Sequence, residues 1–558
     1  QVRDVLYEDV STVRRRRHHL QIGQILEKLH VENLEEYADE LAYHFMEGRD
    51  DTKALEYFLK AGDRAKEVYA NGEASSYFES ALNLLDRTGG DVREKARVTE
   101  TLGNLKNWNM EFEASLKYFS EAVMLLKETR DKRGLTRVYS TMADIFVYQL
   151  GRYEDALAHF NEALKILENE PESPELAQVY FGMADIYIYV LGNLSKGVSL
   201  GRKALNLAEK LGALEVKANC YTDLVFTELT DLQKATEYIK EGIKTALENN
   251  YPLVAAEGYM FIPWFYFALG DFHRAMEYAE EGLEYAGKVG CMTWLGSMMT
   301  GKAWVYMLTG DLEKVTESAE EAMQTSKKTG DLASFCIALG TLGEAYRIMG
   351  EWDKAREYHL QALEIAEKTH IYLDLNFVNS LLGRLYYERE EYGKAEEILQ
   401  KMIEVVEKMG GKTRCPVQLP FTGFVPYIWL SELYLKMGEF KKAEDLADEA
   451  YEIAVKSKSR LHMALTNRLK GMLSSHEKDW KSAIESFGKS KREFEAIEAL
   501  PELIQTLYEY GSTYLQRNQE GDREKAHSLL NQALEISRKI GAKKWIEKII
   551  AKKKLLTA

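Results

Sequence analysis

Small side chains recur along this chain about every 40 residues, each soon after a turn that is often Gly-Asp/Glu-aromatic. A second small residue follows in most units, seven positions later. Because seven residues make about two helical turns, both lie on one stripe, where a neighbouring helix can approach closely. The pattern therefore predicts a repeat array of helices. The first small positions are Ala74, Ser115, Ala156, Gly197, Ala235, Ala275, Val315 (an enlarged case), Ala355, Ala395, Ala443, Ala483 and Ala526.

Each unit predicts two antiparallel helices joined by a short turn. In the clearest copy, residues 334–368, His359 takes an aromatic position of the second helix, so we expect a packed core histidine. A glycine two positions after a lysine is typical of a helix end, because glycine tolerates the left-handed conformation and lysine offsets the carbonyl end of the helix dipole. This pattern predicts helix ends at Gly212, Gly290, Gly330 and Gly541.

The motifs of the clearest copy point to a known repeat family. They are Leu342-Gly343-x-x-Tyr346, then Gly350-x-Trp352-x-x-Ala355, then Ala362. This arrangement resembles the tetratricopeptide repeat (TPR), whose usual unit has 34 residues. Units of about 40 residues are similar to its long-helix subtype, found in sensor arrays and signalling scaffolds. The resemblance covers roughly residues 53 to 541 and implies an all-α fold, a right-handed superhelical α-solenoid of about twelve helix pairs.

Residues 1–47 do not follow the repeat. They contain the segment Val2–Val10, the run Arg14-Arg15-Arg16-Arg17-His18-His19, and Ile22-Gly23-x-x-Leu26-Glu27. This stretch resembles the segment that joins the ATPase half of STAND-class signal transduction ATPases to their helical-repeat sensors, as in cyclases and transcription activators of that plan. His19 takes the histidine position, and Gly23 replaces the family alanine. Ala42-Tyr43-His44-Phe45 resembles the beginning of that family's repeats. The resemblance implies a nucleotide-binding domain upstream of this chain.

These patterns divide the chain into three parts. We expect a linker or partial winged-helix-like segment at 1–47, TPR-like repeats over 48–541, and a C-terminal capping helix with a basic tail at 542–558. One unit is extended to 48 residues by Gly410–Pro420, which holds two of the eight prolines and predicts a loop before residue 426. A functional loop and a plain insertion both fit this segment.

Composition narrows the classes of function. Lys plus Arg number 73 and Asp plus Glu 89, so the net charge of −16 disfavours nucleic acid and anionic membranes as partners. The four cysteines form no CxxC pair, which excludes a cysteine-built zinc finger and fits a reducing, cytoplasmic location. No apolar run approaches the roughly 20 residues that span a bilayer. The Arg14–Arg17 run is interpreted as a solvated or interdomain surface, with phosphate contact as the alternative.

No catalytic constellation stands out in the sequence. The segment from Gly296 to Lys302 fits GxxxxGK, but Ala303 replaces the required Ser/Thr and the segment falls inside a predicted helix, so we interpret the match as coincidence. The eleven histidines show no HExxH and no metal-spaced cluster. Nothing resembles a Ser-His-Asp or Cys-His arrangement. We therefore predict a chain that is not itself an enzyme and uses no cofactor or metal.

The inner face of the array is the predicted binding site. In the resembled family the first helix of each pair lines a concave face, and the position after the Leu-Gly motif points inward. In this chain the middle of that face predicts an aromatic and methionine shelf bordered by charges, typical of a partner or ligand site. Its residues are Met260, Phe261, Trp264, Phe267, Thr300, Trp304, Met307, Glu344, Arg347, Arg384 and Tyr387. The alternative is that longer helices simply pack larger side chains between them.

Three functions fit these features. The first is a regulatory sensor that binds a protein, peptide or small-molecule inducer in its groove and regulates an attached STAND-type ATPase through residues 1–47. The second is a free-standing scaffold for protein complexes. The third is the ligand-sensing part of a transcription regulator. We expect the chain to be a monomer, without nucleic acid or membrane as a partner.

Overall fold

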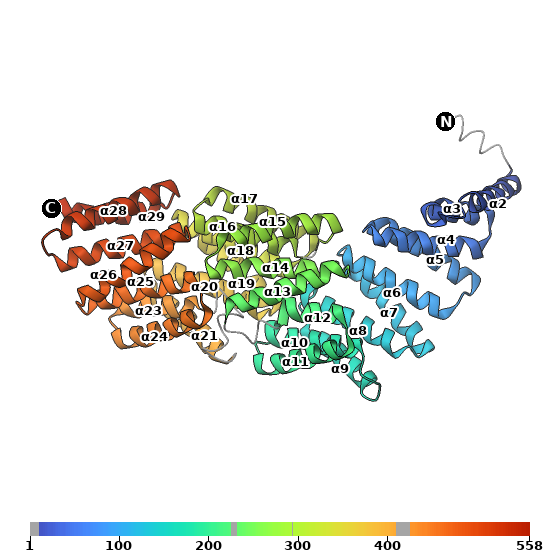
Figure 1. Cartoon of the computed structure of the whole chain (residues 1–558), viewed down its shortest axis with the longest axis horizontal. Coiled ribbons are helices and arrows are strands. Elements are labelled where there is room, and N and C mark those ends of the chain that lie inside the picture. Colours follow the sequence, from blue (N-terminus) through green and yellow to red (C-terminus); the bar gives the residue numbers. More distant parts are fainter. Residues whose placement is uncertain (1–10, 225–230, 293, 409–423, 558) are drawn as a thin grey trace. The chain divides into compact units, whose positions relative to one another are not determined.

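The structure, a computed structural model, describes residues 11–224, 231–292, 294–408 and 424–557. Within these ranges the chain is helical almost throughout and contains no strand (Figure 1). Successive helices pack as antiparallel pairs, so the fold is an all-α solenoid, as the repeat pattern predicted. Among the described helices, none is both long enough and apolar enough to cross a bilayer. Residues 2–10 and the predicted loop at 410–420 lie outside the described residues.

The chain divides into two compact units, which do not coincide with the divisions expected from the sequence pattern. One unit consists of Gln1–Ile145, Ala158–Glu170 and Gly287–Met292, and the other of Phe146–Leu157, Pro171–Ala286 and Thr293–Ala558. The sequence boundaries at 47/48 and 541/542 stay a prediction. The helices of the first unit are α2 (Thr12–Leu29), η1 (Leu34–Tyr37), α3 (Ala38–Gly48), α4 (Asp51–Glu67), α5 (Asn71–Thr88), α6 (Val92–Trp108), α7 (Phe112–Thr129) and α8 (Lys132–Asp144).

The larger unit contains most of the helix pairs. It begins near η2 (Ile145–Gln149) and α9 (Tyr153–Leu167), whose residues belong partly to each unit. Its helices are α10 (Pro174–Asp185), η3 (Ile186–Val190), α11 (Leu194–Leu211), α12 (Leu214–Asn219), η4 (Cys220–Leu224), α13 (Leu232–Glu248), α14 (Pro252–Leu269), α15 (Phe272–Val289), α16 (Leu295–Thr309), α17 (Leu312–Thr329), α18 (Leu332–Met349), α19 (Trp352–Thr369), α20 (Tyr372–Glu388), α21 (Tyr392–Lys408), α23 (Val425–Met437), α24 (Phe440–Ser457), α25 (Arg460–His476), α26 (Trp480–Ala496), α27 (Leu500–Arg517), α28 (Asp522–Lys539) and α29 (Lys543–Thr557).

Small side chains and glycines set the helix pairs, as the sequence pattern predicted. Ala355 and Ala362 of α19 are fully buried. A Cβ atom at Gly343 of α18 would lie 2.3 Å from Cδ2 of His359, so only glycine allows this close approach. All four predicted end glycines have positive φ: 66° at Gly212, 65° at Gly290, 75° at Gly330 and 73° at Gly541. The helix ends are therefore confirmed.

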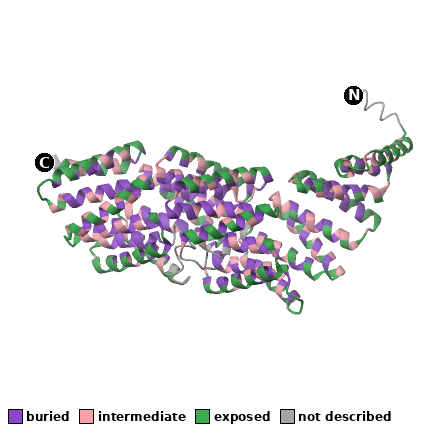
Figure 2. Cartoon of the chain, viewed as in Figure 1, coloured by how far each residue is buried: buried purple, intermediate pink, exposed green. Residues whose placement is uncertain are grey.

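First and second helices of a pair differ in burial. The first helices α14, α16 and α18 bury residues on several sides, because other helices cover more than one of their faces. The second helices α17 and α19 keep a regular exposed face, which for α17 is seen at the upper edge of Figure 2. Charged residues occupy these exposed faces, as expected for an amphipathic helix at the surface. The first helices therefore form most of the core of the larger unit.

Distant helix pairs of the larger unit touch each other along a line that we call the seam. It joins α14 to α25, α16 to α27, and α18 to α29. Ser459 Oγ donates a hydrogen bond to the carbonyl oxygen of Ala268, 191 residues earlier in the chain. Exposed ion pairs join Lys458 to Asp231, and Lys543 to Glu351 at 2.6 Å. Helix pairs far apart in the sequence thus cover one another, and the array is not open along its inner face at these contacts.

Candidate functional site

The predicted shelf lies on the first helices α14, α16, α18 and α20 of the larger unit. Six of its residues are buried: Phe267, Thr300, Trp304, Met307, Glu344 and Arg384. The other five are half-buried: Met260, Phe261, Trp264, Arg347 and Tyr387. We call these eleven residues the inner lining. None of them is exposed, so a partner could reach most of this surface only after the covering helices move.

The aromatic part of the inner lining is a packed cluster. The ring centroids of Trp264 and Trp304 lie 6.2 Å apart, and those of Phe267 and Trp304 lie 6.0 Å apart. Trp304 Nε1 donates a hydrogen bond to Thr341 Oγ1 at 2.9 Å, which satisfies its buried N–H. Phe377 of α20 covers Trp304 from the next repeat, with 5.7 Å between ring centroids. The two tryptophans at equivalent repeat positions therefore meet, and Trp304 belongs to the core while Trp264 remains partly accessible.

The charged part of the inner lining continues into a row of ion pairs, which we call the ladder. Arg347 Nη2 lies 2.7 Å from Glu344 Oε1, and Arg384 Nη1 lies 3.0 Å from Glu432 Oε2. Arg468 Nη2 lies 3.2 Å from the other oxygen of Glu432. The ladder runs over five first helices, α18, α20, α23, α25 and α27, and its members are Glu344, Arg347, Arg384, Glu388, Glu432, Arg468, Glu502 and Gln505.

Each of the three arginines of the ladder pairs with glutamates, of which the ladder has four, although the row is largely buried. Burial alone would raise the pKa of Glu432, but Arg468 and Arg384 lower that pKa below its ordinary value. Burial opposes the charge of Arg384 too, and Glu432 and Glu388 outweigh it and raise its pKa. Gln505 adds a hydrogen bond from its amide nitrogen to Glu432 Oε2 at 3.2 Å. Glu432 and Arg384 therefore stay charged inside the unit, held by their neighbours.

The predicted site included only three of the eight ladder residues, Glu344, Arg347 and Arg384. Arg468 was not expected in the site, although it stands four residues before Met472, which follows Gly471 in α25 as Glu344 follows Gly343 in α18. A helix places residues four apart on one face, so this spacing was an available signal. Glu502 and Gln505 come from α27, and their proximity follows from packing between distant helices. A cavity of about 20 Å³ adjoins Arg347, Arg384, Glu388, Gln505 and Trp545, which is room for about one water molecule.

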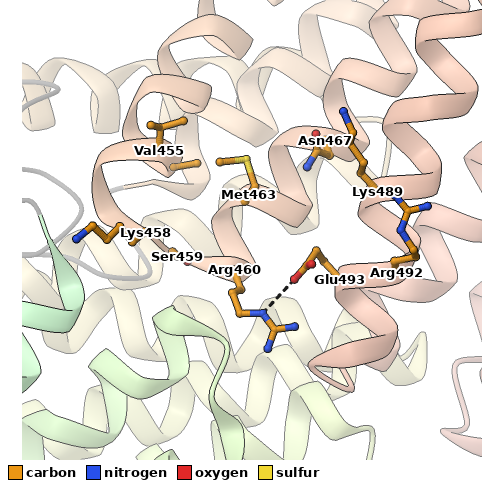
Figure 3. Close-up of a pocket in the computed structure, with 10 residues that line it drawn as sticks. Val455, Lys458, Ser459, Arg460, Met463, Asn467, Lys489, Arg492 and Glu493 are labelled. Carbon is orange, nitrogen blue, oxygen red and sulfur yellow. Dashed lines mark hydrogen bonds and ion pairs between the residues drawn. The ribbon is translucent and has the colours of Figure 1, made fainter.

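A second candidate site is accessible from outside. A pocket of about 490 Å³ lies between α24 and α26, with residues of α25 also lining it. Figure 3 shows the charged heads of its arginines and lysines around the pocket, with Glu493 facing Arg460. Its lining is Ala454, Val455, Lys458, Ser459, Arg460, Met463, Asn467, Lys489, Arg492 and Glu493. No sequence pattern indicated this pocket, because exposed charges such as Lys489 and Arg492 of α26 resemble those of an ordinary solvated helix face.

Two sequence motifs have structural roles. The GxxxxGK segment lies within α16, and Lys302 pairs with Glu280 at 2.9 Å, so the segment is not a phosphate-binding loop after a strand. The interpretation as coincidence is confirmed. His359 is fully buried, and burial lowers its pKa from 6.5 to about 3. The prediction of a packed core histidine is also confirmed.

The N-terminal residues with the STAND-like pattern pack as two helices. His19 of α2 is buried, and its Nδ1 lies 2.9 Å from Nδ1 of His44 in α3. A Cβ atom at Gly23 would lie 3.1 Å from the ring of Phe45, so a larger residue there would require the ring to move. Arg16 donates to the carbonyl oxygen of Gly48 at 3.3 Å. The conspicuous residues of this pattern therefore hold α2 against α3.

Comparison with known proteins supports the repeat assignment. The tetratricopeptide repeat model matches residues 94–169, 134–210 and 334–408, about a third of the chain. These parts of the chain carry tetratricopeptide repeats. No curated protein matches the sequence.

Several solved structures are similar to this chain at low sequence identity. A Rap protein complexed with competence and sporulation factor is 16% identical, with a TM-score of 0.44, over 73% of this chain and 98% of that one. A STAND protein with a tetratricopeptide repeat sensor, from Pyrococcus horikoshii, is 17% identical, with a TM-score of 0.32, over 72% of this chain and 56% of that one. A chain of the APC/C hetero-tetramer Cut9–Hcn1 is 13% identical, with a TM-score of 0.43, over 89% and 96%.

Proposed function

We propose that this chain is a non-catalytic TPR interaction module that binds a protein or peptide partner through its inner lining and thereby regulates an attached STAND-type ATPase in the cytoplasm. The observation that carries the proposal is the inner lining itself. Tryptophans, tyrosine and arginines, the residue types that dominate binding hot spots, are gathered on four consecutive first helices. The repeats themselves are of a kind that serves protein interaction.

The ladder supports a binding role better than a purely stabilising one. Three arginines and their glutamates lose hydration when they are buried, and apolar side chains of similar size would often give equal or greater stability. Charged groups in the lining have a further use when a partner is present. Arginines can exchange an internal glutamate for a carboxylate of the partner, and glutamates can exchange an arginine for a cation of the partner. We infer that the ladder fills the binding surface when no partner is bound.

Access requires the seam to separate. The seam consists of contacts at helix ends, and two of its ion pairs are exposed to solvent, where each contributes roughly 0–1 kcal/mol. Each repeat of a solenoid packs mainly on its neighbours, so small changes between repeats add up along the array. A partner that binds only the open form would shift the population toward it. Residues 1–47 would transmit this conformational change of the larger unit to the ATPase.

The proposal is tested by following the seam and the affinity together. A carbodiimide couples an ion-paired lysine to its carboxylate, so the Lys543–Glu351 pair should cross-link in the free chain. A partner captured from cell extract, identified and purified should lower the yield of this cross-link. Trp264→Ala should weaken its affinity about tenfold, while Leu360→Ala, an exposed residue of α19, serves as the matched control. Unchanged affinity in folded Trp264→Ala and Tyr387→Ala chains would exclude the inner lining.

The regulatory part of the proposal has a separate test. A reading frame upstream of Gln1 that encodes a Gly-rich Lys-Ser/Thr loop and a strand-borne aspartate would support an attached ATPase. In the joined protein, the partner should change the rate of ATP hydrolysis. His19→Ala, which disturbs the contact between α2 and α3, should reduce that response without changing partner affinity. A start codon at this point would favour the free-standing scaffold instead.

A further inference from the structure

The pocket between α24 and α26 is a surface separate from the inner lining, with no residue in common. Arg460, Met463 and Asn467 are spaced by three and four residues along α25, so they share one face of that helix. Arg468 of the ladder lies on a different face. Lys458 stands at the end of α24, while Lys489 and Arg492 come from α26 (Figure 3). Three successive helices therefore supply the pocket, and its charges point to solvent.

The balance of charge in the pocket is positive on a chain that is negative as a whole. Lys458, Arg460, Lys489 and Arg492 line it together with a single carboxylate, that of Glu493. Arg460 Nε already binds Glu493 at 3.0 Å, and Lys458 pairs with Asp231 outside the pocket, so Lys489 and Arg492 carry the remaining positive charge. The chain as a whole has a net charge of −16. Such a local reversal of sign attracts an anionic group to this place and repels it elsewhere.

Two polar groups of the pocket are available for a ligand. Arg492 is exposed and forms no ion pair with any residue that the structure describes. The side-chain amide of Asn467 is half-buried and forms no hydrogen bond within the same described ranges. Lys489 pairs only with Glu485 of its own helix, at 2.7 Å, in an exposed pair that is easily exchanged. Val455 and Met463 add apolar area beside these charged heads.

The shape of the surface favours a peptide over a small molecule. A small ligand is usually enclosed over roughly 70–90% of its surface, whereas the four cations here are exposed at the rim. A second pocket of about 660 Å³ shares Lys458 and Arg460 with the first and extends across the seam to α13, α14 and α15. An extended chain could follow both. The first pocket has no aromatic residue on which a nucleic acid base could stack.

We propose that this pocket binds an acidic peptide segment of a partner protein. Carboxylates of the segment pair with Lys489 and Arg492, the amide of Asn467 binds its backbone, and an apolar side chain rests on Val455 and Met463. The segment continues past Lys458 and Arg460 into the second pocket, whose lining mixes the cations Lys240 and Arg274 with the carboxylates of Glu237, Asp271 and Glu498, so the acidic residues of the segment lie in the first pocket. Because the second pocket has walls on both sides of the seam, the bound segment holds the two sides together.

The test uses the full chain and a short fluorescein-labelled peptide of glutamates around one leucine. Its affinity is measured by fluorescence anisotropy and compared with that of the same peptide with glutamines. Lys489→Glu together with Arg492→Glu should weaken binding of the acidic peptide about tenfold or more. The matched control is Lys327→Glu with Lys328→Glu, which makes the same change of charge at exposed positions of α17. Circular dichroism confirms that both variants remain folded.

Three results would overturn the proposal. The first is equal loss of affinity in both double variants, which would mean that only overall charge matters. The second is equal binding of the glutamine peptide. The third is tighter binding of a single-stranded RNA than of the acidic peptide at the same salt concentration, which would assign the pocket to nucleic acid.

The acidic peptide should also slow hydrogen exchange at 268–273, where the second pocket meets the seam, and unchanged exchange there would contradict its course across both pockets.

Discussion

Two groups of basic residues in the larger unit have opposite surroundings. Arg384 and Arg468 of the ladder are buried, and each has a glutamate within ion-pair distance. Lys489 and Arg492 of the outer pocket are exposed, and Arg492 has no ion-pair partner among the described residues. The same residue types therefore serve different purposes. While no partner is bound, the buried arginines hold helices together through their carboxylates, whereas the exposed cations are open to a ligand without any change in the fold.

This contrast predicts which substitutions lower stability and which lower only the affinity for a ligand. Removing one member of a buried pair leaves its partner charged and dehydrated, so the main consequence is a loss of stability. Removing an exposed cation costs little stability, because water replaces its contacts. A binding role can therefore be tested most clearly at an exposed charge, because its removal leaves the fold stable. Four substitutions test this contrast, in order of decreasing change in stability.

Glu432→Ala should have the largest effect. It leaves Arg384 and Arg468 without their shared carboxylate, and the loss of a buried ion-pair partner typically costs about 3–5 kcal/mol. Urea unfolding followed by circular dichroism measures the change. Glu452→Ala removes an exposed glutamate of α24 and should leave the midpoint almost unchanged. Equal midpoints for the two variants would mean that the ladder does not hold the unit together.

Gly343→Ala probes the packed layer between α18 and α19, next to Glu344 of the ladder. The added methyl group would meet the ring of His359 at 2.3 Å, and overpacking of this kind costs about 1–3 kcal/mol. Gly393→Ala in α21 is the control, because nothing lies within 4 Å of the added atom. Thermal unfolding should therefore separate the two alanine variants. A stable Gly343→Ala chain would show that the two helices can move apart cheaply.

His359 should make stability depend on pH. Burial lowers the pKa of His359 to about 3, and the charge of Arg347 acts in the same direction. In the unfolded chain the side chain takes up a proton below its ordinary pKa of 6.5. Its stabilising contribution is therefore complete above pH 6.5 and is lost as the pH falls toward 3, at up to about 1.4 kcal/mol per pH unit. Unfolding between pH 7 and 5 should be less pH-dependent in His359→Gln than in the wild type, and parallel curves would contradict the assignment.

Arg492→Gln should have the smallest effect on stability. The side chain is exposed and unpaired among the described residues, so its removal should change the free energy of unfolding by less than about 0.5 kcal/mol. Affinity for the acidic peptide should nevertheless fall. A midpoint shift as large as that of Glu432→Ala would mean that the pocket, like the ladder, is part of the folded core. Urea unfolding of Arg492→Gln alongside Glu432→Ala measures both midpoints, and fluorescence anisotropy measures the affinity.

The sequence predicted the helix pairs well because their signals are local. Ala355 and Ala362 mark the stripe where two helices approach, and glycines such as Gly330 mark the helix ends. The residues of the inner lining were also picked out by their repeat position. Their burial could not be predicted in the same way, because it depends on helices that meet across the seam. Gly310, for example, packs on Ile540, 230 residues further along the chain.

Local periodicity by itself therefore determined the class of fold, the length of the repeat and the positions of the first helices. It did so because each helix pair is specified by contacts within about 40 residues. The tertiary structure alone decided that Arg384, Glu432, Arg468 and Gln505 join in one row, and that charges of α24, α25 and α26 surround one pocket. These groupings depend on the angle between successive repeats, a small quantity that accumulates along the array and leaves no pattern in the amino-acid sequence.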